Sequence, residues 1–317
     1  MSRTSNQSKA LATESERKAS RKYFKQSWHY YVLIAPSVIF TIIFAYIPMA
    51  GLQIAFRDYK VKKGFFGSDW VGLEHFIRFV TGDKFWPVLR NTLEINFVSM
   101  IAGLIIPIIV ALMLNELRIK YLKKPIQMVL YAPHFVTTIA VCGIITLFTQ
   151  RETGIINLFI QALGGEGIDF LGNPDYFVAI YVISGIWQST GWGTIIYLAA
   201  LSGVDPQIEE AAIVDGANRF QKIWHVDIPC ILPTIVTMMI LSAGSILATG
   251  YEKVLLLQTP LNMGKAEVIG TYIYEMGIRE GQFSYATAIG FFASVVNIVV
   301  LTVVNFVAKK TTDTSIW

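Results

Sequence analysis

The chain has 317 residues, of which 54% are hydrophobic and only 15% are charged, and its formal net charge is +4. A soluble domain usually carries about 25% charged residues, so this composition excludes an ordinary water-soluble globular protein and indicates a membrane-embedded one. The two cysteines, Cys142 and Cys230, lie far apart in or beside apolar runs. This placement favours two inert buried thiols over a disulfide framework or a metal site.

The N-terminal segment 1–28 is polar and basic, with seven Lys and Arg residues against two glutamates. We predict that it is a disordered cytoplasmic tail, because such a sequence buries too little apolar surface to fold. The apolar stretch that follows is much longer than the roughly 7–15 residues of a signal-peptide h-region. It therefore predicts a retained membrane span.

Six stretches of the chain are long and apolar enough to cross a membrane. A spanning helix needs about 20 apolar residues, and a helix satisfies its own backbone polar groups in hydrocarbon. The predicted spans are 30–56, 92–114, 127–149, 176–202, 231–250 and 284–307. The predicted fold is therefore an all-α membrane protein, with six transmembrane helices in a domain over 29–310 and a cytoplasmic tail at 311–317.

An even number of spans places both termini on one side of the membrane. That side would carry 15 Lys and Arg residues, against 11 on the opposite side. Basic segments stay preferentially in the cytoplasm, so we predict cytoplasmic termini. The external loops hold 11 basic and 12 acidic residues, and this near-neutral face offers no general attraction to polyanions.

The predicted cytoplasmic loop 203–229, between the fourth and fifth spans, contains signals for two short helices. Asp205 precedes a proline, and this pair is typical of an N-cap acceptor followed by a residue that needs no amide donor. Gly216 is predicted to end the first helix in a left-handed conformation. Asn218 is predicted to cap the second helix, and Pro229 to end it.

These signals predict a helix–turn–helix that lies against the membrane and presents small side chains. Small residues let a second helix or a groove approach closely, which suits the docking of a protein partner. The alternative is an amphipathic linker that rests on lipid, although this loop has few Lys or Arg residues with which to bind anionic headgroups.

The same loop carries a recognisable spacing of residues. Glu210-Ala211-Ala212 is followed after three residues by Gly216 and, after nine more, by Val226-Asp227-Ile228-Pro229. This resembles the EAA motif of permease subunits of binding-protein-dependent ABC importers, in which Ile and Leu stand where this chain has Val226 and Ile228. Other segments resemble permeases of the carbohydrate-uptake group, above all the LplB-type polysaccharide and oligosaccharide permeases. These segments are 46–56, 70–73, 91–93, 111–116, 131–135, 195–200 and 211–220.

The resemblance implies a MetI/MalF-like permease core in the cytoplasmic (inner) membrane. Its implied partners are a second homologous permease subunit, two ATPase subunits and an extracytoplasmic solute-binding protein that delivers an oligosaccharide. The EAA loop would transmit the motion of the ATPase subunits to the spans. The residues implied in this coupling are Glu210, Ala211, Ala212, Asp215, Gly216 and Pro229. The chain would be a transport subunit and not an enzyme.

The sequence offers no device for binding ATP. Gly264-Lys265 lacks both the upstream glycine and the following hydroxyl residue of a phosphate loop. ATP and Mg²⁺ are therefore expected in the partner ATPase, and no cofactor or metal in this chain.

The predicted spans contain no Asp, Glu, Lys or Arg deep in the membrane. Intramembrane charges usually mark ion or proton pathways, so their absence counts against an ion-coupled secondary sugar transporter, the main alternative. A membrane scaffold or receptor without transport activity is a third class.

The fourth predicted span has the most polar centre, at residues 184–194. Aromatic faces with amide or hydroxyl partners commonly bind sugars, and this centre supplies both. The candidates for the substrate pathway are Trp187, Gln188, Trp192, Asn91 and Tyr251. The alternative is helix packing, in which Gly185 and Ser189 let two backbones touch. Both interpretations stay open, since they can hold on different faces of one helix.

Overall fold

The computed structural model describes residues 27–117, 119–312 and 314–317. The predicted disordered tail 1–28 therefore lies outside the described residues, except for its last two, which are helical. The chain divides into two compact units, Met1–Gln53 and Ile54–Trp317.

The first unit contains most of one long helix, Ser27–Phe56. Its regular turns give way to a π-helical segment, η1 (Ile42–Tyr46), before the short helix α2 (Ile47–Met49) and the 3₁₀ segment η2 (Ala50–Phe56). Pro48 lies two residues after the end of the π-helical segment. Proline has no amide donor and clashes with the preceding turn, and a π-bulge is one way in which a helix accommodates that disruption.

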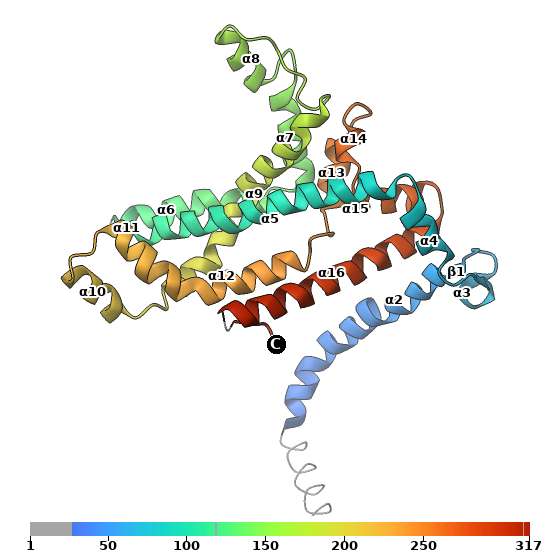
Figure 1. Ribbon diagram of the computed structural model, residues 1–317, viewed down its shortest axis with the longest axis horizontal. Coiled ribbons are helices and arrows are strands. Elements are labelled where there is room, and N and C mark those ends of the chain that lie inside the picture. The colour runs from blue at the N-terminus through green and yellow to red at the C-terminus, as the bar shows by residue number, and fades with distance from the viewer. Residues whose placement is uncertain (1–26, 118, 313) are drawn as a thin grey trace, which may run out of the picture. The chain divides into compact units, whose positions relative to one another are not determined.

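Long helices dominate the second unit. They are α5 (Phe85–Asn115), α9 (Phe177–Leu201), α12 (Ile228–Ala243) and α16 (Phe283–Thr312). Helix α5 packs along α9, and α12 packs against α16 (Figure 1). Buried Leu112, Tyr197 and Ile231 join α5, α9 and α12 into one apolar core cluster.

Shorter elements connect these helices. They are β1 (Arg57–Asp58), α3 (Gly64–Gly67), β2 (Asp69–Trp70), α4 (Glu74–Thr81), α6 (Lys120–Tyr131), η3 (Ala132–Phe135), α7 (Thr138–Thr149), α8 (Ile155–Ala162), η4 (Pro174–Tyr176), α10 (Pro206–Val214), α11 (Arg219–Lys222), η5 (Ile223–Asp227), α13 (Tyr251–Leu257), α14 (Met263–Ala266), α15 (Ile269–Tyr274) and η6 (Glu275–Arg279). Strands β1 and β2 pair antiparallel. The fold is mostly helical, and this two-residue ladder is its departure from the predicted all-α class.

Within the described residues, four helices are long and apolar enough to cross a membrane, or five if a bent pair counts as one span. The four are Ser27–Phe56, Phe85–Asn115, Arg219–Ala243 and Phe283–Thr312. Helix α9, which corresponds to the predicted fourth span, is 25 residues long, but the polar residues at its centre lower its hydropathy. The six-span topology therefore stays a prediction.

Two predicted spans differ from the helices observed. The third, 127–149, is broken, because Tyr121–Phe135 and Thr138–Thr149 meet at 96°. Thr137 at the break is extended and caps the second helix by accepting a hydrogen bond from the Ala140 amide. The fifth, 231–250, was placed too late, since its helix runs through Arg219–Ala243 and gives way to turns after Ala243.

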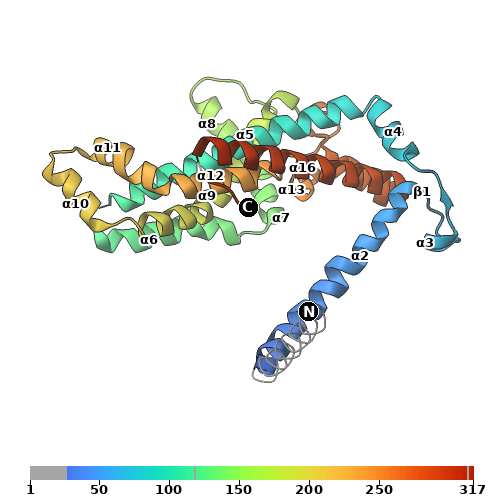
Figure 2. The ribbon, with the colours of Figure 1, turned by 60° about the horizontal axis from the view of Figure 1, so that its bottom comes forward.

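The two ends of the second unit differ in construction. Helices α10 and α11 lie at one end, and α4 lies at the opposite end (Figures 1 and 2). At the α4 end, buried Phe79, Val88, Tyr272 and Ile289 join α4, α5, α15 and α16 in a second apolar cluster. The α10–α11 end is held by caps and ion pairs.

Candidate functional site

The loop at 203–229 folds as the predicted helix–turn–helix. The Asp205 carboxylate accepts a hydrogen bond of 2.9 Å from the Gln207 amide and caps α10. Asn218 caps α11 with a capping box, in which its side chain and that of Gln221 each accept from the other residue's amide, at 3.0 and 2.8 Å. Such caps satisfy amides that a short helix otherwise leaves without partners.

Gly216 makes the turn between the two helices and has the predicted positive φ, at 82°. Its amide donates to the Ile213 carbonyl, and the Ala217 amide donates to the Ala212 carbonyl, both at 3.0 Å. These are the two hydrogen bonds of a Schellman motif. The chain direction after α10 therefore depends on the left-handed conformation of Gly216, which favours glycine.

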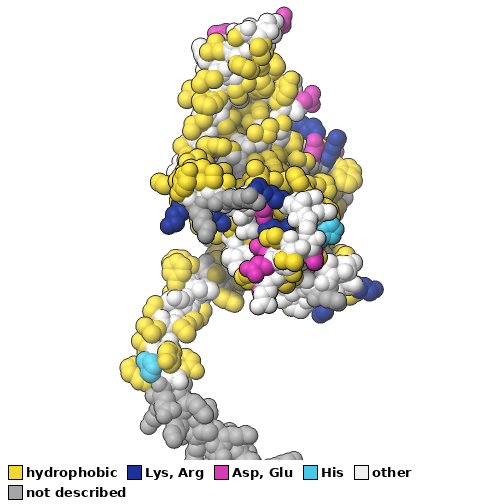
Figure 3. Space-filling model, turned by 90° about the vertical axis from the view of Figure 1, so that its left-hand side faces the viewer, with side chains coloured by type: hydrophobic (Ala, Val, Ile, Leu, Met, Phe, Trp, Pro, Cys, Tyr) yellow, Lys and Arg dark blue, Asp and Glu magenta, His cyan; other side chains and the backbone are white. Residues whose placement is uncertain are grey.

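The surface of this loop is open. Glu210, Ala211, Asp215 and Gly216 are exposed and Ala212 is half-buried, and charged side chains gather at this end of the unit (Figure 3). Large apolar side chains are exposed among them: Ile208, Ile213, Val214, Phe220 and Trp224. A groove of about 330 Å³ runs between α10 and α11. The loop thus presents an apolar surface with a hollow, bordered by charge.

Lys222 fastens this loop to the helix bundle. Its amine lies 2.5 Å from a carboxylate oxygen of Glu116, at the C-terminal end of α5, 3.6 Å from Glu209 on α10 and 3.7 Å from Asp227. The Asp227 side chain is fully buried, and neither of its oxygens has a hydrogen-bond partner. Lys222 is therefore the cation that compensates a buried carboxylate and connects three helical segments.

The sequence predicted that Pro229 ends the second short helix, and this prediction is wrong. It lies inside the continuous helix Arg219–Ala243, at the start of α12. The π-helical segment η5 directly precedes α12 and accommodates the missing amide of Pro229. The second half of the loop is consequently rigid with the helix that follows, so displacement of α11 would displace α12.

A second candidate site is a cavity of about 410 Å³ between α5, α9 and α13. Helix α9 lines it with Tyr181, Gly185, Gln188 and Trp192, among others. Their spacing of three or four residues places them on one helical face. The Gln188 amide donates to the Val136 carbonyl at 3.0 Å, and Trp192 stacks on the His134 ring at 4.6 Å between centroids. An amide and an aromatic ring therefore meet at one cavity wall.

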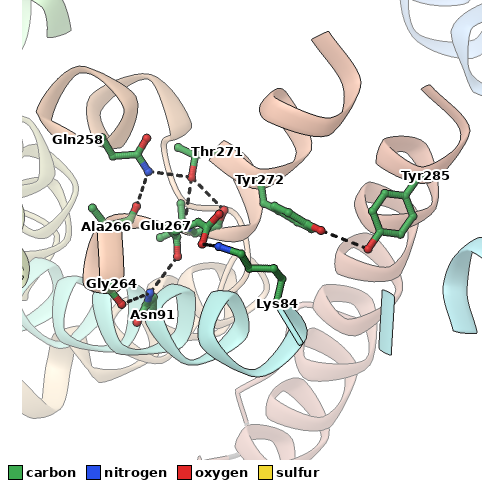
Figure 4. Close-up of polar contacts among 10 residues, drawn as sticks. Lys84, Asn91, Gln258, Gly264, Ala266, Glu267, Thr271, Tyr272 and Tyr285 are labelled. Carbon is green, nitrogen blue, oxygen red and sulfur yellow. Dashed lines mark hydrogen bonds and ion pairs between the residues drawn. The ribbon is translucent and has the colours of Figure 1, made fainter. Parts of the chain in front are cut away.

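The structure separates the predicted pathway residues. Gln188 and Trp192 line this cavity, whereas Trp187 lines a different, apolar pocket between α7 and α9. Asn91 is buried and donates to the Gly264 and Glu267 carbonyls at 3.0 Å (Figure 4), so its amide tethers α5 to the α14 segment. Tyr251 is half-exposed and stacks on Tyr274.

The packing alternative for α9 holds, but at a different glycine from the one expected. A Cβ added to Gly191 would overlap the Leu130 carbonyl oxygen, so α6 and α9 touch at the backbone there. A Cβ at Gly185 would lie 3.6 Å from the Lys253 amine, across the cavity wall. Gly185 and Ser189 therefore line the cavity, and Gly191 makes the close helix contact.

With this geometry in place, a comparison with known proteins identifies the family. Residues 96–313 match the family described as "Binding-protein-dependent transport system inner membrane component". The chain belongs to this family. The permease assignment based on the EAA motif is thereby confirmed.

Full-length relatives of this permease support the assignment. Protein LplB of Bacillus subtilis (strain 168) is 44% identical over 280 residues, which are 88% of each chain. The polygalacturonan/rhamnogalacturonan transport system permease protein YteP of the same strain is 42% identical over 285 residues, 90% of this chain and 89% of that protein. The chain is thus a multi-pass inner-membrane permease of an ABC transporter that works with a binding protein, and it is a transport component.

A solved structure shares the fold. A chain in the crystal structure of a bacterial alginate ABC transporter, in complex with an alginate pentasaccharide-bound periplasmic protein, is 36% identical with a TM-score of 0.85. The match covers 93% of this permease and 99% of that chain. The permease therefore has the fold of a subunit from an assembled ABC transporter.

Sequence reasoning missed two lysines of this permease. Lys222 was counted only as a loop charge, because its partner Glu116 lies more than a hundred residues earlier in the chain. Lys253 was assigned to an external loop, yet it is 8% exposed and lines the cavity. Lys253 and the buried Leu257 lie four residues apart, a spacing that places both on one face of a helix. This spacing was the signal in the sequence that Lys253 could face the protein interior.

Proposed function

We propose that this permease forms one half of the pathway of an ATP-driven importer that moves an oligosaccharide across the cytoplasmic membrane. A second homologous permease would form the other half, two ATPase subunits would bind ATP and Mg²⁺, and an extracytoplasmic solute-binding protein would deliver the cargo. The names of relatives support a saccharide cargo. They include YteP and the arabinooligosaccharides transport system permease protein AraP of Bacillus subtilis, which is 28% identical over 284 residues.

We further propose six spans with both termini in the cytoplasm, with α9 as the fourth span. Its 25 residues extend about 37 Å at 1.5 Å per residue, more than the roughly 30 Å of hydrocarbon. Polar residues in a span are tolerated where they face a cavity inside the protein. The cavity beside Gln188 and Trp192 supports this placement of α9.

The proposal rests on the structure of the 203–229 loop. Two capped helices with exposed apolar side chains are connected by Lys222 to α5 and continue directly into α12. A rigid, partly apolar protrusion of this kind can receive a force from a docked partner and pass it to two helices. We propose that Glu210, Ala211, Ala212, Asp215 and Gly216 contact the ATPase subunit, and that Pro229 lies in the helix that receives the motion.

The proposal is tested by Gly216→Val in the complete transporter. A residue with a Cβ at φ 82° is strained by about 1 kcal/mol, and more if branched, although the space around Gly216 is open. The turn should therefore change direction while the spans stay inserted. We expect normal abundance in the membrane, with loss of ATPase co-purification and of saccharide uptake. Glu210→Lys should act similarly, because it reverses an exposed charge on the proposed docking surface.

Matched controls lie elsewhere on the same chain. Gly281 also has a positive φ, 69°, and open space around it, so Gly281→Val imposes comparable strain outside the loop. Glu166 is exposed, so Glu166→Lys repeats the charge reversal. Both controls should keep ATPase association. Wild-type association for both loop variants would contradict the coupling role, and ion-driven uptake by the permease alone would support a secondary transporter instead.

A further inference from the structure

Lys253, on α13, is a buried cation without a carboxylate partner in the described part of the chain. Its side chain is 8% exposed, its amine donates to the Tyr181 carbonyl at 3.1 Å, and it lies 4.8 Å from the centre of the Tyr181 ring. Among the described residues, no carboxylate lies within ion-pair distance of this amine. An ammonium group has three donors, and burial of such a charge is unfavourable unless it is paired and hydrogen-bonded.

Other lysines in the surrounding segments are paired. Lys265 lies 2.8 Å from Glu94, and Lys84 lies 2.6 Å from Glu267. Both of these ion pairs lie at more exposed positions than Lys253. These two lysines therefore have carboxylate partners although water could also solvate them, whereas the more deeply buried Lys253 has no carboxylate partner among the described residues.

The amine of Lys253 lies at the wall of the α5–α9–α13 cavity. A Cβ added to Gly185 would lie 3.6 Å from this amine, so the glycine leaves that wall uncovered. The cavity volume of about 410 Å³ falls within the roughly 300–1,000 Å³ of small-molecule sites. The other polar groups on its wall include the Gln188 amide and the hydroxyl groups of Ser99, Ser189 and Thr190.

We propose that Lys253 is the counter-charge for a carboxylate of the transported saccharide, so that the cargo of this permease contains uronate residues. A neutral sugar would be served by the aromatic ring, the amide and the hydroxyls alone. A uronate adds a carboxylate, which would accept a charge-assisted hydrogen bond from Lys253. This inference rests on the proposed function as an oligosaccharide importer.

The test uses the complete transporter, with its binding protein, in liposomes. The probes are oligogalacturonate and mannuronate–guluronate oligomers, together with the same oligomers after reduction of their carboxyl groups to alcohols. We expect wild-type transporter to import at least one uronate oligomer. Lys253→Met keeps an unbranched side chain of nearly the same length and removes its charge. It should lower uronate uptake at least about tenfold relative to uptake of the reduced oligomer, since a hydrogen bond to a charged group contributes about that factor.

Two further variants separate charge from structure. Lys253→Arg keeps the charge and should retain most of the preference for the uronate. Lys265→Met removes a cation that Glu94 already pairs and should leave the ratio of uronate to reduced-oligomer uptake unchanged. Membrane abundance and ATPase co-purification of each variant show that the complex has assembled.

The remaining outcomes overturn the inference in distinguishable ways. The uronate assignment is contradicted if the wild type imports only neutral oligomers. It is also contradicted if Lys253→Met lowers uptake of the uronate oligomer and of the reduced oligomer equally. Both results leave the importer function in place. Failure of Lys253→Met to assemble with the second permease, with Lys253→Arg assembling normally, identifies a carboxylate of that partner as the counter-charge. No uptake of any saccharide by the wild type overturns the proposed function, and the inference with it.

Discussion

Lys222 and Lys253 are both largely buried, but the chain surrounds them differently. Lys222 faces carboxylates of Glu116, Glu209 and Asp227, all within 3.7 Å, whereas Lys253 has one carbonyl and one aromatic ring. A cation that the chain pairs with its own carboxylates joins elements together. A cation left without one beside a cavity is available to a ligand. The comparison separates a structural lysine in the loop from a binding lysine in the cavity.

The largest effect is expected when the structural lysine is removed. Lys222→Met leaves Asp227 buried without a compensating charge, and breaking a buried ion pair from one side is destabilising by up to roughly 3–5 kcal/mol. We expect the loop to detach from α5, with loss of ATPase co-purification and increased cleavage of the loop by protease in membrane vesicles.

A second substitution sharpens that prediction. In Lys222→Met combined with Asp227→Asn, the buried carboxylate is replaced by a neutral amide, so stability should recover in part. Lys222→Arg should retain the charge and most of the association. If Lys222→Met alone left protease resistance and ATPase association unchanged, the structural role of Lys222 would be wrong.

An intermediate effect is expected at the glycines that shape the cavity. Gly191→Ala would place a methyl group on top of the Leu130 carbonyl oxygen, so α6 and α9 must separate, and overpacking of this kind typically costs about 1–3 kcal/mol. We expect reduced thermal stability of the purified permease. Gly185→Ala is the matched control, because its methyl group would make only ordinary contact, 3.6 Å from the Lys253 amine. Equal stability of the two variants would contradict the close contact of α6 and α9.

Local signals in the sequence predicted local structure well. The caps at Asp205 and Asn218 and the positive φ of Gly216 were all predicted, because each depends on neighbouring residues only. The EAA spacing predicted the family for the same reason, since it lies within one short stretch of the chain.

What the sequence did not show depends on contacts between distant segments. The carboxylate closest to Lys222 is that of Glu116, more than a hundred residues earlier. The glycine that touches a neighbouring helix, Gly191, was identifiable only once α6 lay beside α9. Hydropathy measures apolar length and does not register a bend, so it missed the break at 136–137 and the early end of the fifth span. Lys253 was missed because a cation outside every predicted span was taken to be solvated.

The smallest expected effect is on the pH dependence of uptake, and it concerns the binding lysine. Burial lowers the pKa of the Lys253 amine to about 8, and the titratable groups that interact with it include the Tyr181 ring on α9 and the Cys142 thiol on α7. The charged form therefore predominates below about pH 8 and is lost above it, so its fraction falls from about 90% at pH 7 to about 10% at pH 9.

Uronate uptake, divided by uptake of the carboxyl-reduced oligomer, should fall several-fold across this range, because only the charged amine attracts a carboxylate. A bound carboxylate stabilises the charged form, so saturating uronate should move the midpoint to higher pH. Lys253→Met should give a flat ratio, and a flat ratio in the wild type would contradict the binding role of Lys253.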